Sequence, residues 1–548
     1  MKKIFQNFFL LLLLIIILGG FLRFYHLNWD QGLAFHPDER NIIFAVEKIQ
    51  IPQELNPHFF AYGSLPIYFI RITADVLNLF SPHHQLIKSY GDYNLLGRLI
   101  SAIFSTISIY LIYLLGRKLS SSKVGLLSAC LFALSPGLIQ YAHYSVTESW
   151  LVFFLLLISI YAIKIDESPN LKNWLILAIF CGLAIGTKIV AIIFLIIPLV
   201  TWLFSFRKVG KVKNLILSLV FILTMAIVYF ISSPYTILDF PNFKNSISYE
   251  NSVVTGKMIV PYTLQFLGTK PYLFFFQNLG WQTNFILPTL GFLGIIVWLI
   301  YIWKTKKEVP VLPFLIFALV YFIAVGWWQA KFIRYMLPFV PFLILAASWL
   351  IFQILKRWRI LGNGLIVIII AISFLWSLAY LSVFIHESTR ISASKWIYQN
   401  VPWERTLLIE HWDDKLPVKL KGENPEKYQY LTMKNYDPET EEKISKMADN
   451  LASGDYLILS SRRLSGSIPK DPQDCPITSK YYDKLFAKKL GYQQVFQVTS
   501  YPRIWRWQIN DDQAEETFQV FDHPKVMIFQ NVAKLSPNEL LNILKDNS

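Results

Sequence analysis

Two adjacent carboxylates stand beside a histidine and an arginine near the start of the chain, in the stretch FHPDER at residues 35–40. A charge-free apolar run, FFLLLLLIIILGGFL, precedes this stretch closely. Asp38 could accept a proton while Glu39 orients a substrate hydroxyl, with His36 or Arg40 keeping one carboxylate ionised. A simpler interpretation is that Asp38 caps the helix that begins there. The two roles are compatible, and both stay open.

Further ionisable residues stand at the ends of apolar runs. Lys188 follows the run that ends in GLAIGT, and Arg334 lies in KFIRYMLPFVPF. Such cations either reach the lipid headgroups or bind an anion, and a guanidinium suits phosphate. Glu148 begins another run, where the helix dipole would also favour it, and His143 precedes it closely. Gathered near the acidic pair, these residues would form a phosphate- or diphosphate-lipid site with a base beside it.

Neither a metal nor another cofactor is indicated. Histidine and carboxylate residues occur at the candidate site, but without the spacing that is diagnostic of a metal site. Cys130 and Cys181 lie in apolar runs and Cys475 lies outside them, so neither a disulfide framework nor a cysteine metal site is expected.

The composition indicates a membrane protein with several helical spans. Of 548 residues, 54% are hydrophobic and 16% are charged, and the mean hydropathy is +0.43. A soluble protein would carry about a quarter charged residues. Eleven apolar runs are long enough to cross a hydrocarbon core of about 30 Å. They are residues 4–22, 95–115, 124–141, 148–164, 173–187, 189–206, 214–232, 286–303, 310–326, 335–355 and 362–384.

The run at residues 64–80 is a tempting twelfth span. It contains Pro66, Arg71 and Asp75, and charges at bilayer depth cost several kcal/mol. Excluding it also places every basic cluster on one side of the membrane. We therefore expect an amphipathic segment in the outer interface.

The net charge of +15 is explained by short basic loops between spans. Such loops mark the cytoplasmic side, so they imply a cytoplasmic N-terminus in a cell membrane and no nucleic-acid partner. The opposite, outer face then receives loops 23–94 and 233–285 and everything after residue 385. It also receives the ionisable residues at the span ends, which are Asp38, Glu39, Arg98, His143, Glu148, Lys188 and Arg334.

Residues 386–548 have a different composition, polar and normally charged. Helical patterns in ISASKWIYQN, PETEEKISKMADNLAS and SKYYDKLFAKKL alternate with strand-like runs in TLLIE, DYLILSS, QQVFQVTSYP and KVMIF. The sequence therefore predicts two domains: an all-α polytopic membrane domain at residues 1–385 and a small extracytoplasmic α/β domain at residues 386–548.

The order of motifs resembles the GT-C integral-membrane glycosyltransferases, specifically bacterial relatives of the dolichyl-phosphate-mannose protein mannosyltransferases and the aminoarabinose transferases (glycosyltransferase family 39-like). The matching pieces are the acidic pair in HPDER, GRLISA with Arg98, SPGLIQYAHYSVTES with Glu148, GLAIGTK with Lys188, and RYMLPFVP with Arg334 and Tyr335. The resemblance covers essentially the whole chain. In the third of these pieces, Glu148 replaces the Asp that is common at this turn.

The resemblance implies inverting sugar transfer from a polyprenyl-phosphate donor to a lipid, glycan or protein hydroxyl. Asp38 would be the general base and Glu39 would orient the acceptor or its loop. Lys188 and Arg334 would hold the donor phosphate. Loop 233–285, with Tyr235 and Tyr262, would close over the site. The remaining substrate-binding residues would be His36, Arg98, His143, Glu148 and Tyr335.

Three alternatives remain. One is an oligosaccharyl transferase with a diphosphate-linked donor. Another is a transporter or flippase for lipid-linked glycans, which should carry charges through the bilayer depth and inverted repeats. Here the charges share one face and no repeat is visible. A non-catalytic scaffold for the tail domain would leave the charged cluster without a purpose.

The topology can be tested by labelling single cysteines with a membrane-impermeant thiol reagent, after Cys130, Cys181 and Cys475 have been replaced. We expect a cysteine at Ser248 to react from outside intact cells and one at Ser122 to react only after lysis. External reactivity at Ser122 would contradict the eleven-span topology.

Overall fold

The computed structural model of the chain describes residues 2–80, 86–307 and 309–546, with the side chains of residues 2–7 and 205–209 left aside. The chain divides into two compact units. Unit 1 comprises residues 1–251 and 271–380, and unit 2 comprises residues 252–270 and 381–548. The middle of the loop at 233–285 therefore belongs with the tail and not with the helices that flank it.

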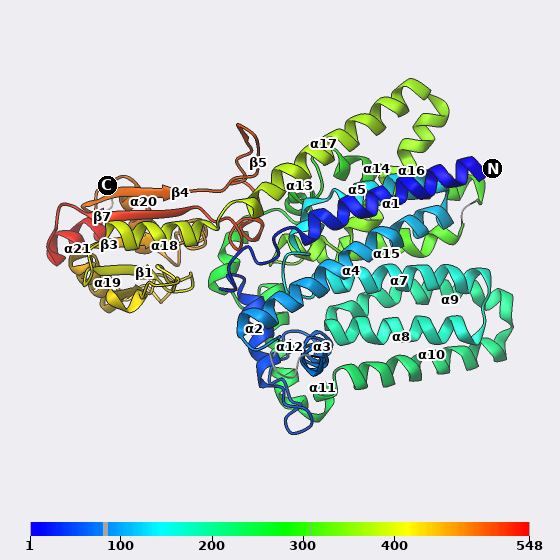
Figure 1. Cartoon of the computed structure of the whole chain (residues 1–548), viewed down its shortest axis with the longest axis horizontal. Coiled ribbons are helices and arrows are strands. Elements are labelled where there is room, and N and C mark those ends of the chain that lie inside the picture. Colours follow the sequence, from blue (N-terminus) through cyan, green and yellow to red (C-terminus); the bar gives the residue numbers. More distant parts are fainter. Residues whose placement is uncertain (1, 81–85, 308, 547–548) are drawn as a thin grey trace. The chain divides into compact units, whose positions relative to one another are not determined.

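Unit 1 consists of helices, most of them long and apolar (Figure 1). Its α-helices are α1 (Lys2–Phe24), α2 (Pro37–Lys48), α3 (Leu65–Leu79), α4 (Tyr90–Leu119), α5 (Ser122–Ala133), α6 (Pro136–Gln140), α7 (Glu148–Glu167), α8 (Leu171–Thr187), α9 (Ile196–Val209), α10 (Lys211–Ser232), α11 (Tyr235–Leu238), α13 (Leu273–Gln282), α14 (Leu287–Thr305), α15 (Leu312–Gly326) and α16 (Val340–Arg357). Helices α12 (Phe240–Thr255) and α17 (Arg359–Ile385) continue into unit 2. Short 3-10 helices are η1 (Ile189–Leu195), η3 (Val309–Val311) and η4 (Ile333–Met336).

Each predicted span coincides largely with an apolar helix, except that the run at 124–141 is divided: α5 ends at Ala133 and the short α6 begins at Pro136. Among the residues that the structure describes, seven helices are long and apolar enough to cross a membrane, namely α4, α7, α10, α14, α15 with η3, α16 and α17. Four shorter apolar helices, α1, α5, α8 and α9 with η1, account for the other predicted spans. The chain is a multi-pass membrane protein with the predicted all-α membrane region.

Within residues 64–80, Leu65–Leu79 form α3, a helix of 15 residues. Figure 1 views α3 nearly end-on, whereas α7, α8 and α10 run across the picture, so α3 lies roughly perpendicular to them. Arg71 and Asp75 form an ion pair of 3.0 Å along it. This orientation supports the expectation of an interfacial helix.

A buried ion cluster, Asp30–Glu39–Arg98, connects α4 to the start of α2, which carries the acidic pair, and to the loop before α2. Arg98 of α4 donates from Nε and Nη2 to the two oxygens of Glu39, at 2.8 and 2.7 Å. Nη1 and Nη2 donate to Asp30 at 2.9 and 2.6 Å, and Nη1 also donates to the carbonyl of Leu27 at 2.9 Å. All five N–H donors of the guanidinium are thereby used. The three charged residues are at most 1% exposed.

The same cluster reaches a third segment of unit 1. The backbone N–H of Ser145, in the turn before α7, donates to Glu39 Oε1 at 2.6 Å. The guanidinium carbon of Arg98 also lies 4.9 Å from the ring centroid of Trp29, within the range of a cation–π contact. Charged groups in so dry a place are stable only when fully paired, so the cluster fixes where α2 begins.

Unit 2 contains a mixed five-stranded sheet in the order β2-β1-β3-β7-β4. β1 pairs in parallel with β2 and β3, while β7 pairs antiparallel with β3 and β4. The strands are β1 (Thr406–Glu410), β2 (Gln429–Met433), β3 (Tyr456–Leu459), β4 (Tyr492–Val498) and β7 (Val526–Asn531), and β5 (Arg503–Ile504) and β6 (Trp507–Gln508) form a separate hairpin. The helices are α18 (Thr389–Asn400), α19 (Glu441–Ser453), α20 (Pro476–Phe486) and α21 (Pro537–Lys545), with 3-10 turns η2 (Pro261–Phe266), η5 (Pro425–Lys427), η6 (Ile468–Lys470) and η7 (Glu516–Phe518).

This arrangement confirms the predicted α/β tail. Each helix and strand expected from its pattern is present, and β2, α21 and the β5–β6 hairpin are additional. Within unit 2, Arg390 of α18 pairs with Asp414 at 2.9 Å and with Asp413 at 3.6 Å. These pairs fasten the first helix of the tail to the loop that follows β1.

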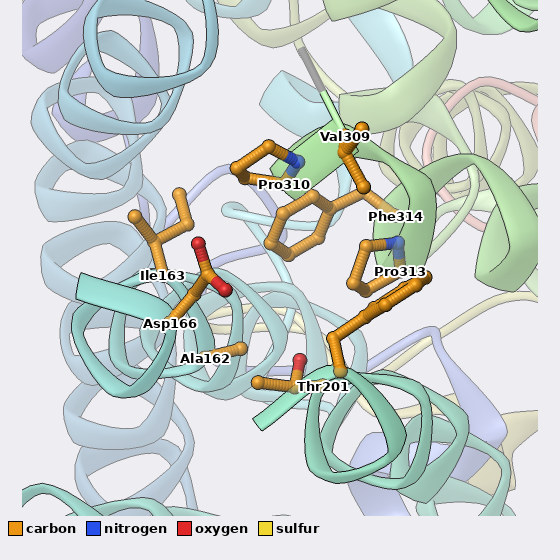
Figure 2. Close-up of a pocket in the computed structure, with 9 residues that line it drawn as sticks. Ala162, Ile163, Asp166, Thr201, Val309, Pro310, Pro313 and Phe314 are labelled. Carbon is orange, nitrogen blue, oxygen red and sulfur yellow. The ribbon is translucent and has the colours of Figure 1, made fainter. Parts of the chain in front are cut away.

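A cavity of about 300 Å³ lies between α7, α9 and the start of α15 (Figure 2). Its lining is apolar except for Asp166 and Thr201. Asp166 is 18 residues after Glu148 on α7, a distance of about 27 Å along a helix. This cavity is therefore remote from the charged residues predicted to form the site.

From the ion cluster we predict that two substitutions of a paired cation, Arg98→Met and Lys118→Met, lower the free energy of unfolding by very different amounts. Arg98→Met leaves two buried carboxylates unpaired and should cost about 3–5 kcal/mol. Lys118→Met breaks a 2.7 Å pair with Glu167 whose side chains are 32% and 54% exposed, and should cost at most about 1 kcal/mol. Thermal unfolding in one detergent compares the two variants. Equal unfolding midpoints would contradict the role given to Arg98.

Candidate active site

His36, and not Asp38, caps the helix that carries the acidic pair. α2 begins at Pro37, and the His36 ring Nδ1 accepts the N–H of Asp38 at 3.2 Å. The interpretation of Asp38 as the cap residue was therefore wrong, because the cap position falls two residues earlier. Asp38 instead lies in the first helical turn, where the helix dipole stabilises its negative charge.

Asp38 and Arg334 form an ion pair between Nη1 and Oδ2, across almost the whole length of unit 1 in sequence. The side chains are 19% and 13% exposed, so the pair is shielded but reachable. The Tyr62 hydroxyl also hydrogen-bonds Asp38. Burial alone would raise the pKa of the Asp38 carboxyl, but the charges of Arg334 and His36 and the Tyr62 hydrogen bond hold it below its usual range.

Lys188 contacts the same tyrosine. Its Nζ donates to Glu148 Oε1 at 3.2 Å and lies 4.6 Å from the centroid of the Tyr62 ring. Cations and carboxylates thus alternate around a tyrosine: Glu148, Lys188, Asp38 and Arg334. Burial, followed by the charge of Asp38, raises the pKa of Tyr62 well above its usual value, so Tyr62 is a hydrogen-bond donor here.

Close backbone packing holds Lys188 beside the loop that carries Tyr62. The Gly63 N–H donates to the carbonyl of Thr187 at 3.0 Å. A Cβ at Gly63 would lie 2.0 Å from the carbonyl oxygen of Gly186, and one at Gly186 would lie 2.1 Å from Ser232 Oγ. Glycine at position 63 thus permits the approach of this loop to α8, while glycine at position 186 permits the approach of α8 to Ser232 of α10.

Glu250 of α12 is a third carboxylate near the two cations. Burial raises the pKa of Glu250, while the charges of Lys188 and Arg334 oppose that effect. Neither Glu250 nor Tyr62 stands in a charged motif or at the end of an apolar run. The sequence held no signal for them beyond their membership of the two outer loops.

Several predicted site residues lie apart from this cluster. Both ring nitrogens of His143 contact backbone carbonyls, of Ile139 at 2.8 Å and of Tyr25 at 2.9 Å, and the residue is fully buried. Glu39 and Arg98 are fully used in the buried ion cluster. None of the three presents an exposed polar atom in the structure, and their predicted contacts with substrate stay predictions. Of the two roles expected for Glu39, positioning of the loop is the one that this geometry permits.

Two further predicted residues stand against the cluster. The His36 ring packs edge-on against Tyr144, with centroids 4.8 Å apart. The Tyr335 ring lies 5.9 Å from the Arg334 guanidinium, and the Tyr335 backbone carbonyl accepts a hydrogen bond from Tyr321 at 2.6 Å.

The two tyrosines of the loop predicted to close over the site belong to different units. Tyr235 begins α11 of unit 1 and Tyr262 lies in η2 of unit 2.

The arrangement can bind an anion and hold a base next to it. Arg334 Nε is buried and makes no hydrogen bond to any residue that the structure describes, so it can donate to a ligand that also meets Lys188. Within the described ranges, no group of three or more His, Cys, Asp or Glu side chains is arranged to hold a metal ion. The polar chemistry of the site thus comes from two cations, three carboxylates and a tyrosine.

Residues 86–234 match the family model described as dolichyl-phosphate-mannose-protein mannosyltransferase. In a comparison with curated protein sequences, no sequence matches the chain.

Among solved structures, the Archaeoglobus fulgidus oligosaccharyltransferase in the apo form is 14% identical with a TM-score of 0.55, over 96% of this chain and 88% of that one. The same enzyme with an inhibitory peptide and a dolichol-phosphate is 13% identical with a TM-score of 0.53, over 92% and 75%. ArnT from Cupriavidus metallidurans, bound to undecaprenyl phosphate, is 13% identical with a TM-score of 0.48, over 96% and 98%.

The matched family segment contains α7 and α8, which carry Glu148 and Lys188 into the site. The likeness to the Archaeoglobus structures extends the agreement in fold over nearly the whole chain. Together, the comparisons show that residues 86–234 are similar to the dolichyl-phosphate-mannose-protein mannosyltransferase family and that the chain shares its fold with the Archaeoglobus fulgidus oligosaccharyltransferase.

Proposed function

We propose that the chain transfers a sugar from a polyprenyl-phosphate donor to an acceptor hydroxyl at the outer face of the cell membrane, with inversion and with Asp38 as the general base. The observation that carries this proposal is the pairing of Asp38 with Arg334, beside Lys188, in an accessible part of unit 1. The family description over residues 86–234 supports a lipid-phosphate sugar as donor.

Arg334 and Lys188 bind the donor phosphate and stabilise the negative charge that develops on it as the sugar departs. Arg334 offers a forked donor set, and Lys188 a compact point charge. Glu148 holds Lys188 in place through its 3.2 Å contact. Asp38 then takes the proton of the acceptor hydroxyl as that oxygen attacks the anomeric carbon.

Asp38 and the donor phosphate compete for Arg334. A carboxylate held by a guanidinium is a weak base, because its pKa is low. When the phosphate takes up hydrogen bonds from Arg334, Asp38 loses part of that stabilisation and its pKa rises. Donor binding thereby strengthens the base at the moment when the acceptor needs it.

Asp38→Asn should lower transfer by about 10²–10⁴-fold, since the amide cannot accept the proton. Asp75→Asn is the matched control, because Asp75 lies on α3 with a 41% exposed side chain, paired with Arg71. Transfer is measured from a radiolabelled polyprenyl-phosphate sugar in membranes at equal protein level. Undiminished transfer in Asp38→Asn would refute the assignment of the base.

Arg334→Gln should raise the KM for the donor and shift the acid limb of the pH profile to higher pH. Without the guanidinium, burial dominates and the pKa of Asp38 rises, so the carboxylate is protonated, and lost as a base, earlier as the pH falls. In the wild type, this loss should begin only below the usual carboxyl pKa of about 3.9. Arg359→Gln, at an exposed position that starts α17, should leave the profile unchanged. An unshifted acid limb in Arg334→Gln would contradict the coupling.

A further inference from the structure

The hairpin β5–β6 in unit 2 exposes two tryptophans at its tip. Arg503 pairs with Gln508 and Ile504 with Trp507, so Trp505 and Arg506 form a two-residue loop. Trp505 is 94% exposed and Trp507 is 82% exposed. Figure 1 shows the hairpin, labelled β5, projecting from the rest of the tail. Large aromatic side chains are rarely left this open to water without a partner surface.

The backbone at the tip adds a second cost. Trp505 has a φ of +56°, and a two-residue hairpin loop with positive φ at its first position normally places glycine there. A bulky residue in this region is strained by about 1–3 kcal/mol. The sequence thus keeps a tryptophan where glycine would be easier, at the most exposed point of the hairpin.

The base of the hairpin is attached to the end of the last apolar helix. The Arg503 N–H donates to Ser382 Oγ at 2.9 Å, and Arg503 Nε donates to His386 Nε2 at 2.8 Å. Ser382 lies in the last turn of α17, which ends at Ile385, and His386 follows it directly. All of these residues belong to unit 2.

This attachment sets the depth of the hairpin in the membrane. α17 has 27 residues and is about 40 Å long, so its end reaches the polar boundary of a hydrocarbon core about 30 Å thick. The hairpin therefore starts at the level where tryptophans are enriched in membrane proteins. This conclusion does not depend on which side of the membrane that end occupies.

We propose that the β5–β6 hairpin is a membrane-interface anchor, in which Trp505 and Trp507 insert among the lipid headgroups and Arg506 binds lipid phosphate. Trp rings combine an apolar body with a polar N–H and suit the boundary between acyl chains and headgroups. An exposed arginine beside them adds a fork for phosphate oxygens. The anchor fixes the first turn of the tail domain at the membrane surface, next to the exit of α17.

Site-directed fluorescence in lipid nanodiscs tests the anchor with the full chain. Cys130, Cys181 and Cys475 are replaced, and Trp505→Cys is labelled with an environment-sensitive fluorophore. Trp403→Cys is the matched control, because Trp403 is 62% exposed in the same unit but lies beyond the far end of α18. Both positions are exposed, so neither change should disturb folding, and an unchanged thermal unfolding midpoint verifies this.

We expect nitroxide lipids with the spin label near the headgroup to quench the fluorophore at position 505 strongly, and lipids labelled deep in the acyl chain to quench it weakly. The emission at 505 should also shift to the blue, and the control at 403 should do neither. Quenching at 505 no greater than at 403 would overturn the proposal. The proposal would also be overturned if the nitroxide lipids did not quench the label at 505 and soluble oligosaccharide shielded that label from water. The tip of the hairpin would then be a sugar-binding surface.

Discussion

The architecture of the site depends on one buried guanidinium. All the hydrogen-bond donors of Arg98 bond to Glu39, Asp30 and a backbone carbonyl. The surroundings are too dry to stabilise any of these charges alone. Because Glu39 is the neighbour of Asp38, the cluster holds α2 with its first turn facing Arg334. The two acids of one dipeptide therefore have separate tasks: one is buried and fixes the helix, and the other is partly open and free to take part in chemistry.

Around Asp38 the charges alternate in sign, and each is held by a different element. Glu148 comes from the start of α7, Lys188 from the end of α8 and Arg334 from the turn before α16. Their mutual pairing lets unit 1 keep four charged groups at the edge of an apolar helix bundle, where isolated charges would be costly. The two cations of this set are thus already positioned, each paired with a carboxylate.

Much of this arrangement could be read from the sequence, because length, hydropathy and basic loops largely determine which segments span a membrane. The α/β pattern of the tail was equally legible, since its helices and strands alternate with clear periodicity. The roles of individual side chains were harder to predict from the sequence. Arg98 and His143 looked like ligand residues because charge near a span is unusual, yet in the structure both are buried and their polar atoms are used in hydrogen bonds within the protein. Tyr62 and Glu250 come from long loops, whose approach to Arg334 depends on tertiary packing that no local pattern encodes.

The contact between Gly63 and Gly186 gives this arrangement a diagnostic. The Gly63 N–H meets the Thr187 carbonyl, and a Cβ at Gly63 would clash with the carbonyl of Gly186, so a side chain at position 63 would push the loop that carries Tyr62 away from Lys188. A related chain that retains the lysine and the acidic pair but has lost the glycine at position 63 would have to arrange its tyrosine and lysine differently. Glycine at this position is thus a simple criterion, legible without a structure, for recognising other chains that share this particular arrangement of charges.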